Sequence, residues 1–136
     1  MRIFFLLATL AFGLTHAAAT AAKPVTYICN LEVGRRMNWV PKQLVVLIEP
    51  GAKTALVNDP IIQYFLKKPM TAKVTADNGQ RLGLGWSYMV TDGKGRDKSE
   101  MIYSAIIRKS DMHVSMRAVP AGYDNTFSAG GSCKKQ

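Results

Sequence analysis

The feature that most constrains the fold is a two-residue alternation of apolar and polar side chains. It runs through Val25–Glu32, Met70–Ala76 and Leu82–Val90. Because successive side chains of a β-strand point to opposite faces, the alternation indicates strands that are buried on one side. Residues typical of tight turns, such as Pro50-Gly51 and Asn78-Gly79, separate the segments. The pattern predicts an all-β protein.

About seven short strands with a turn every 8–12 residues are typical of a β-sandwich or a small barrel. We therefore expect an antiparallel meander that forms one of the two. The segment Pro60–Lys68 is ambiguous. Asp59 and Pro60 favour the start of a helix, but Pro69 limits the length of that helix to two turns. We therefore expect a short helix or a loop lying on the sheet. We expect residues 119–136 to be irregular apart from a short strand around Cys133.

The N-terminal segment has the three parts of a secretory signal peptide. Met1-Arg2 supplies a positive charge, Ile3–Leu14 an apolar core, and the following residues up to Ala22 are mostly small. The apolar core is shorter than the about 20 residues that cross a bilayer. We expect a signal peptide at residues 1–19, cleaved between 17 and 22, and a single β domain at 20–136. The protein would then be periplasmic or secreted, with no membrane span.

The chain has two cysteines. An even pair in an exported protein is most simply a disulfide, and there is no Cys-x-x-Cys motif that would suggest redox chemistry. We predict a Cys29–Cys133 bond that ties the first strand to the C-terminal tail. A chain joined near both termini favours a closed or nearly closed meander, which also removes exposed strand edges.

Catalytic and cofactor motifs are absent from the sequence. His113 is the only histidine beyond the signal peptide, and strand alternation places it opposite Met112, Val114 and Met116, which argues against a copper site. No nucleophile elbow, phosphate loop or dinucleotide fingerprint occurs. Most carboxylates fall in turns or at strand ends. We predict a protein that is not an enzyme and has no catalytic residue, metal site or cofactor.

The balance of charges is strongly basic, with 18 Lys and Arg against 9 Asp and Glu and a net charge of +9. A surplus of this size fits a solvated surface that keeps the protein soluble. It also fits attraction to an anionic partner, which in a cell envelope means an acidic glycan, a lipid headgroup or an acidic protein. Export argues against nucleic acid as the partner.

Aromatic and basic residues occur together in the segments that join the strands. The candidate binding residues are Arg35, Arg36, Trp39, Tyr64, Phe65, Lys67, Lys68 and Tyr123. Loops of a β scaffold often carry binding residues. Alternatively, Trp39, Phe65 and Phe127 plug the barrel ends, because aromatic side chains are mostly buried.

These residues predict an exported, non-enzymatic binding protein that recognises an anionic partner through an aromatic and basic loop surface. One alternative is a carrier that holds a small apolar ligand inside a lipocalin-like barrel. Inward-facing Gly83 and Gly85 would leave room for such a ligand, whereas inward-facing Leu84 and Trp86 would fill the space. The other alternative is a periplasmic protein inhibitor, in which one projecting loop dominates binding.

Short motifs along the chain carry two resemblances. The motifs are Tyr27-x-Cys29, Trp39-x-Pro41-x-Gln43, Asp59-Pro60-x-Ile62-Gln63-x-Phe65, Tyr123-Asp124-Asn125-x-Phe127 and Gly131-x-Cys133. Together they resemble small exported bacterial proteins of uncharacterised function, which implies no activity. The first and last motifs, at the chain ends, are also similar to those of the periplasmic inhibitors of c-type lysozyme, which implies a small disulfide-closed β-barrel.

Overall fold

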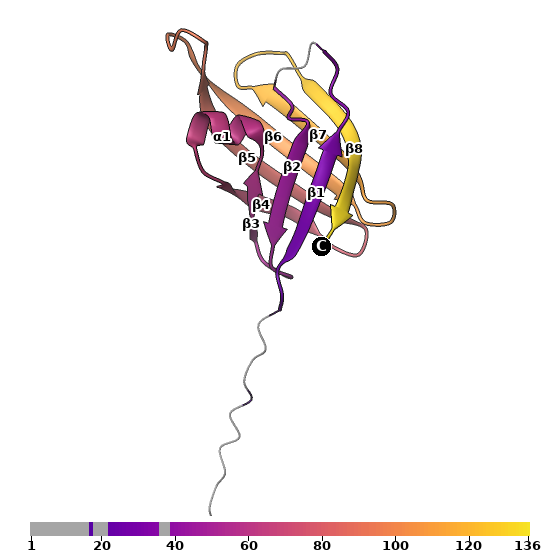
Figure 1. Cartoon of the computed structure of the whole chain (residues 1–136). Coiled ribbons are helices and arrows are strands. Elements are labelled where there is room, and N and C mark those ends of the chain that lie inside the picture. Colours follow the sequence, from indigo (N-terminus) through magenta and orange to yellow (C-terminus); the bar gives the residue numbers. More distant parts are fainter. Residues whose placement is uncertain (1–16, 18–21, 36–38) are drawn as a thin grey trace, which may run out of the picture.

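The computed structural model describes residues 17, 22–35 and 39–136, which form a closed barrel of eight antiparallel strands and one short helix (Figure 1). The elements are β1 (Val25–Leu31), β2 (Gln43–Ile48), β3 (Thr54–Asn58), α1 (Pro60–Leu66), β4 (Met70–Asp77), β5 (Arg81–Thr91), β6 (Lys98–Arg108), β7 (His113–Pro120) and β8 (Phe127–Lys135). Each strand pairs with the next in sequence, and β8 returns to pair with β1. The predicted antiparallel meander is confirmed, and it is a barrel. Nearly all of the predicted signal peptide lies outside the described residues.

The apolar face predicted for the longest alternating segment points into the barrel. Leu82, Leu84, Trp86, Tyr88 and Val90 of β5 are all buried. The other strands contribute inward side chains in the same alternating way, and these form one continuous core. An eight-stranded barrel has an interior just wide enough for side chains to fill.

The meander divides the connections between the two ends of the barrel. One end, here called the loop end, holds the long connections 32–42, 59–69, 92–97 and 121–126. The opposite end, the turn end, holds the shorter connections 49–53, 78–80 and 109–112 together with the start of β1 and the end of β8. In Figure 1 the loop end is at the top of the barrel, and the C-terminus lies at the bottom.

The disulfide predicted from the cysteine pair is present. Cys29 of β1 and Cys133 of β8 are direct partners across the two strands, with 3.9 Å between their Cα atoms. Both side chains are buried. The bond therefore lies at the seam where the last strand closes the barrel onto the first.

The C-terminal region differs from the sequence prediction. Residues 119–136 were expected to be largely irregular because of their glycines, but β8 is a nine-residue strand that pairs with both β7 and β1. The prediction was wrong because it took glycine only as a strand breaker. A Cβ atom at Gly131 would collide with the carbonyl of Asn30 in β1. Glycine here allows the close approach of two backbones that closes the barrel.

A second glycine accompanies a bulge between β4 and β5. The register of the pair shifts between Val74 and Ala76, so Thr75 is the extra residue. A Cβ atom at Gly83 would lie only 2.6 Å from the Thr75 hydroxyl oxygen. The absence of a side chain at Gly83 thus makes room for the bulged Thr75.

Candidate functional site

The aromatic and basic segments singled out in the sequence all lie at the loop end of the barrel. This follows from the topology, because in an up-and-down meander every second connection returns to the same end. The segments are far apart in the sequence, but the closed barrel brings them to one surface. The loop end is therefore the candidate binding site.

Helix α1 positions one part of this site. Asp59 precedes the helix, and its Oδ1 atom accepts hydrogen bonds from the N–H groups of Ile61 (2.7 Å) and Ile62 (2.8 Å). Pro60 occupies the first turn, and Lys67 ends the helix in the left-handed conformation with φ of 60°. The short-helix alternative for this segment is confirmed. Burial of Ile62 fixes the helix on the barrel and leaves Tyr64 68% exposed on its outer side.

A cluster of aromatic rings joins this helix to the loop that follows β1. Trp39 stacks on Phe65 with 6.2 Å between ring centroids, and Tyr64 meets Phe65 edge-on at 4.9 Å. The Lys67 Nζ atom lies 5.3 Å from the centroid of the Tyr64 ring, a cation–π distance. A hollow of about 300 Å³ is lined by Trp39, Pro60, Ile61, Tyr64 and Phe65. We call it the helix hollow.

Trp39 also lines a second hollow, of about 240 Å³, at the mouth of the barrel. Its other lining residues are Val90, Thr91, Asp92, Asp97, Ser99, Met101, Pro120, Tyr123, Asn125 and Phe127. We call it the mouth hollow. Since one tryptophan is common to both hollows, they are neighbours on the loop end.

The structure brings together all four predicted aromatic residues, but in two different roles. Trp39 and Phe65 are half-buried and pack against the core, as does Phe127, which is the kind of packing that the plugging alternative expects. Tyr64 and Tyr123 are instead strongly exposed, at 68% and 64%. The site thus consists of anchored rings that also face solvent and of exposed rings beside them.

The predicted basic residues border the helix side of the site. Lys67 and Lys68 are exposed at the C-terminal end of α1, and Arg35 is exposed in the connection that leads to Trp39. Arg36 lies outside the described residues. Lys67 and Lys68 thus lie at the end of the helix whose first turns line the helix hollow, while Lys94, Arg96 and Lys98 are exposed in and next to the 92–97 connection at the mouth hollow. The lining of neither hollow includes a Lys or Arg residue.

Below the loop end, aromatic stacking continues into the barrel. Phe65 lies 6.4 Å from Tyr88, whose ring stacks on Tyr103 at 5.2 Å, and Tyr103 stacks on Trp86 at 5.6 Å. This series of contacts connects the surface ring of Trp39 to the centre of the core. It gives the candidate site a rigid support, because buried side chains are closely packed.

Three ionisable groups near the candidate site are buried: Asp59, which caps α1, and Tyr88 and Tyr103 in the core. Burial raises the pKa of the Asp59 carboxyl, against the opposing effect of its two backbone N–H donors. Burial also raises the pKa of Tyr103 to about 12, and that of Tyr88 further. These groups are shielded from solvent by the helix and the packed rings. We interpret Asp59 as the helix cap that the sequence predicted.

The interior of the barrel bears on the carrier alternative. Leu84 and Trp86 point inward and are buried, whereas Gly83 faces the bulged Thr75. This is the arrangement in which side chains fill the interior.

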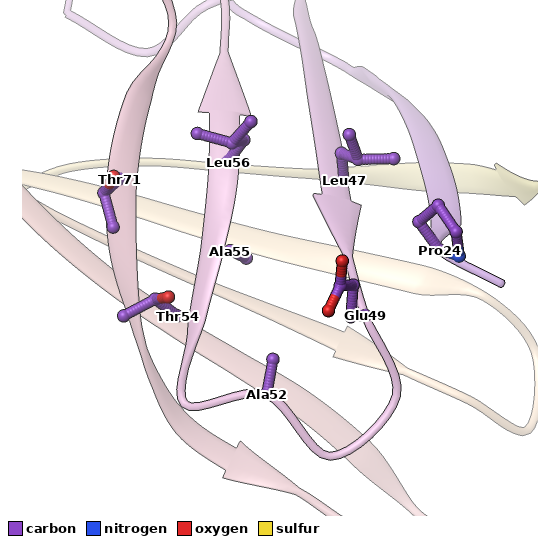
Figure 2. Close-up of a pocket in the computed structure, with 8 residues that line it drawn as sticks. All are labelled: Pro24, Leu47, Glu49, Ala52, Thr54, Ala55, Leu56 and Thr71. Atoms are coloured by element: carbon purple, nitrogen blue, oxygen red, sulfur yellow. The ribbon is translucent and has the colours of Figure 1, made fainter. Parts of the chain in front are cut away.

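A further groove, of about 360 Å³, lies on the outer wall of the barrel and was not anticipated from the sequence. Figure 2 shows the side chains of Leu47 in β2 and Leu56 in β3 projecting beside each other, with Thr71 of β4 and Pro24 at the sides. Leu47 and Leu56 are cross-strand partners, 38% and 46% exposed. The groove is apolar with one acidic residue, Glu49. It is separate from the aromatic and basic residues of the loop end.

The sequence analysis missed the polar residues of the mouth hollow. Asp97 was assigned with the other carboxylates to turns and strand ends, and Ser99 and Asn125 were not among the candidate binding residues, yet all three border a concave aromatic surface. A meander topology places the 92–97 connection at the same end as the other long loops, but it does not show which side chains of these loops meet. Among the residues that the structure describes, no group of three His, Cys, Asp or Glu side chains is arranged to hold a metal ion. No helix there is long and apolar enough to cross a membrane.

Comparisons of the chain with known protein families, with curated proteins and with solved structures find no match. The resemblances carried by the short motifs stay predictions.

Proposed function

We propose that this protein is an exported, non-enzymatic binding protein that recognises an acidic glycan through the loop end of its barrel. The observation that carries the proposal is the position of Trp39. Its ring anchors to the core through Phe65, and it lines two adjoining hollows that also contain the exposed rings of Tyr64 and Tyr123.

The charges beside the helix hollow support an anionic partner. Lys67 lies over the Tyr64 ring, and Lys68 follows it in the chain as a second exposed cation. Arg35 is exposed in the 32–42 connection, which also carries Trp39. Exposed cations of this kind attract an anion over about 10 Å at moderate ionic strength, and salt screens the attraction. The interaction should therefore weaken as salt concentration rises.

The shape of the site supports a glycan over a lipid headgroup or a protein surface. The two hollows measure about 240 and 300 Å³, at or below the lower limit of about 300 Å³ for pockets that enclose a small ligand. Each is suited to one ring-sized group, and the two adjoin at Trp39. Aromatic faces pack well on the C–H faces of sugar rings, and lysine ammonium groups pair with their carboxylates.

Titration with oligogalacturonate, a uniformly acidic saccharide, tests the proposal. Trp39 and Trp86 are the two tryptophans of the chain, and Trp86 is buried, so a change in fluorescence on binding reports on Trp39. We expect saturable binding that is weaker at about 0.2 M salt than at about 0.02 M. Replacing Lys67 and Lys68 together by Gln should weaken binding about three- to tenfold, the range for two exposed ion pairs.

The matched control is the double replacement of Lys134 and Lys135 by Gln. These two exposed lysines lie at the turn-end half of β8, and the control removes the same charge. It should leave binding nearly unchanged. Equal weakening by both double variants, or no saturable binding of oligogalacturonate, would overturn the proposal. Binding to phosphatidylglycerol vesicles without binding to the saccharide would point to a lipid headgroup instead.

A further inference from the structure

We infer that a basic hollow on the barrel wall, near the turn end, binds the phosphate group of a phosphate monoester. The hollow measures about 300 Å³, and its lining residues are Gln80, Arg81, Ile106, Arg108, His113 and Ser115. We call it the turn-end hollow. It lies toward the opposite end of the barrel from the proposed glycan site, so the inference is independent of the proposed function.

Three neighbouring strands bring the basic side chains of this hollow together. Arg81 begins β5, Arg108 ends β6, and His113 begins β7. Strand alternation directs the side chains of Arg108 and His113 to the outer face of the wall, because their neighbours Ile107 and Val114 are buried in the core. The cluster is therefore a product of the strand order and was not visible as a motif in the sequence.

Arg81 and Arg108 place two like charges directly opposite each other. They are cross-strand partners of β5 and β6, a position in which Cβ atoms lie about 4.5–5.5 Å apart. Like charges in such a pair repel each other, and no acidic residue lines the hollow. An anion held between the two guanidinium groups replaces this repulsion with two attractions.

The acidic residues beside the hollow are each paired with a cation. Asp111 accepts hydrogen bonds from Nε (2.8 Å) and Nη2 (2.6 Å) of Arg108, and Asp77 pairs with Lys109 at 2.7 Å. Among the residues that the structure describes, no carboxylate pairs with Arg81. The charge of Arg81 is therefore available to a ligand.

The bond to Asp111 positions Arg108 without using all of its donors. Of the five N–H donors of a guanidinium group, the two hydrogen bonds to Asp111 use two, so three remain for a ligand. The backbone N–H of His113 donates to Oδ1 of the same carboxylate at 3.2 Å. Asp111 thus ties the end of β6 to the start of β7 and holds the Arg108 guanidinium beside the hollow.

The lining of the hollow favours a phosphate monoester as the ligand. Phosphate oxygens accept hydrogen bonds, and the guanidinium groups, the Gln80 amide and the Ser115 hydroxyl can all donate them. A phosphate monoester carries a charge of about −1.5 to −2 at pH 7, which suits two arginines better than the single charge of a carboxylate. Ile106 is 45% exposed and offers an apolar surface to the carbon skeleton that bears the phosphate.

Titration with glucose 6-phosphate, with glucose as the uncharged comparison, tests the inference by NMR. His113 is the only histidine beyond the expected signal peptide, so its ring signals report on the hollow. We expect these signals to shift saturably with glucose 6-phosphate and not with glucose. Arg81→Gln should weaken binding about tenfold, the effect of losing one hydrogen bond to a charged group. Arg81→Lys should retain part of the affinity, because it keeps the charge but loses the forked geometry.

Arg117→Gln is the matched control for Arg81→Gln. Arg117 is exposed on the same outer wall, at the next outward position of β7 after Ser115, and it does not line the hollow. The control removes the same charge and should leave the binding of glucose 6-phosphate nearly unchanged. The double replacement of Lys67 and Lys68 by Gln should also leave it unchanged, because these lysines lie at the loop end.

A second assay separates the two sources of a phosphate monoester, a soluble metabolite and the lipid phosphatidic acid. Vesicles of phosphatidylcholine with and without phosphatidic acid are sedimented with the protein. Binding of glucose 6-phosphate that Arg81→Gln weakens supports the site for a soluble ligand. Binding to the phosphatidic acid vesicles alone, weakened by the same variant, supports the site and assigns it to the lipid.

Two results would overturn the inference. One is that neither glucose 6-phosphate nor phosphatidic acid binds, and the other is that Arg81→Gln and Arg117→Gln weaken binding equally, which indicates a general effect of charge. In both cases the proposed function stands or falls on its own test with oligogalacturonate. Unfolding midpoints of the variants within about 2 °C of the parent protein establish that any loss reflects the site and not misfolding.

Discussion

Removal of the Cys29–Cys133 bond provides a quantitative test of how the barrel is stabilised. The bond joins residues 104 positions apart. Cross-linking a loop of that length removes about 16 cal/mol/K of entropy from the unfolded chain, or about 4.7 kcal/mol at 25 °C. This corresponds to a change of more than three orders of magnitude in the folding equilibrium constant. Since small domains have a total stability of about 5–15 kcal/mol, the bond supplies a large part of it.

Urea unfolding of the oxidised protein, the reduced protein and the Cys29→Ala/Cys133→Ala double variant measures this contribution. We expect the free energy of unfolding of both the reduced protein and the double variant to be about 4–5 kcal/mol lower than that of the oxidised protein. Both should also show a larger m-value, because their unfolded chains are more expanded. The β1–β8 hydrogen bonds should persist at low urea in any fraction that folds. A loss below about 1 kcal/mol would refute the loop-entropy reasoning. The reasoning would also be refuted if the double variant lost the full stability of about 4–5 kcal/mol and the reduced protein lost none. That result would indicate that packing of the two side chains is the cause.

Three further changes test other parts of the structure by urea unfolding. Asp59→Asn keeps a side chain that caps the helix but removes a buried charge. Because burial raises the folded-state pKa of Asp59 above 3.8, the folded protein binds more protons and loses stability as pH rises from 3.8 through the folded pKa. The Asn variant should escape this loss and be the more stable at pH 7, and a less stable variant there would contradict the assignment. Gly131→Ala should destabilise the barrel by about 1–3 kcal/mol through the collision with β1, whereas Gly79→Ala, in open space, should stay within about 0.5 kcal/mol; similar effects of the two would argue against the close approach. Met116→Ala, at a fully buried position, should cost about 2–5 kcal/mol, and Ile102→Ala, at a position 46% exposed, about 0.5 kcal/mol or less, since only the first leaves a cavity.

The loop end, the binding surface that we propose, combines a rigid base with exposed aromatic and charged groups. Trp39 and Phe65 are held by stacking that continues through Tyr88 into the core. The exposed rings and charged side chains are carried by four separate connections whose ends are fixed by paired strands. A binding surface built in this way loses little conformational entropy when a ligand docks, because its central groups are already ordered.

The sequence by itself determined the local features of this protein. Side-chain alternation in segments such as Leu82–Val90 depends only on the strand repeat, and the capping of α1 by Asp59 depends on groups within three residues of one another. The cysteine pair was also sufficient to predict the disulfide, since the chain offers no other partner for either thiol. These features follow from short-range geometry and covalent chemistry, which a linear pattern records.

The tertiary structure decided the features that depend on residues far apart in the chain. β8 was predicted as irregular because the need for Gly131 arises only from its approach to Asn30, about a hundred residues earlier in the sequence. The mouth hollow likewise forms only when the connections bearing Trp39, Asp97 and Tyr123 meet at one end of the closed barrel. Strand pairing around the barrel sets those distances, and no local pattern in the sequence encodes it.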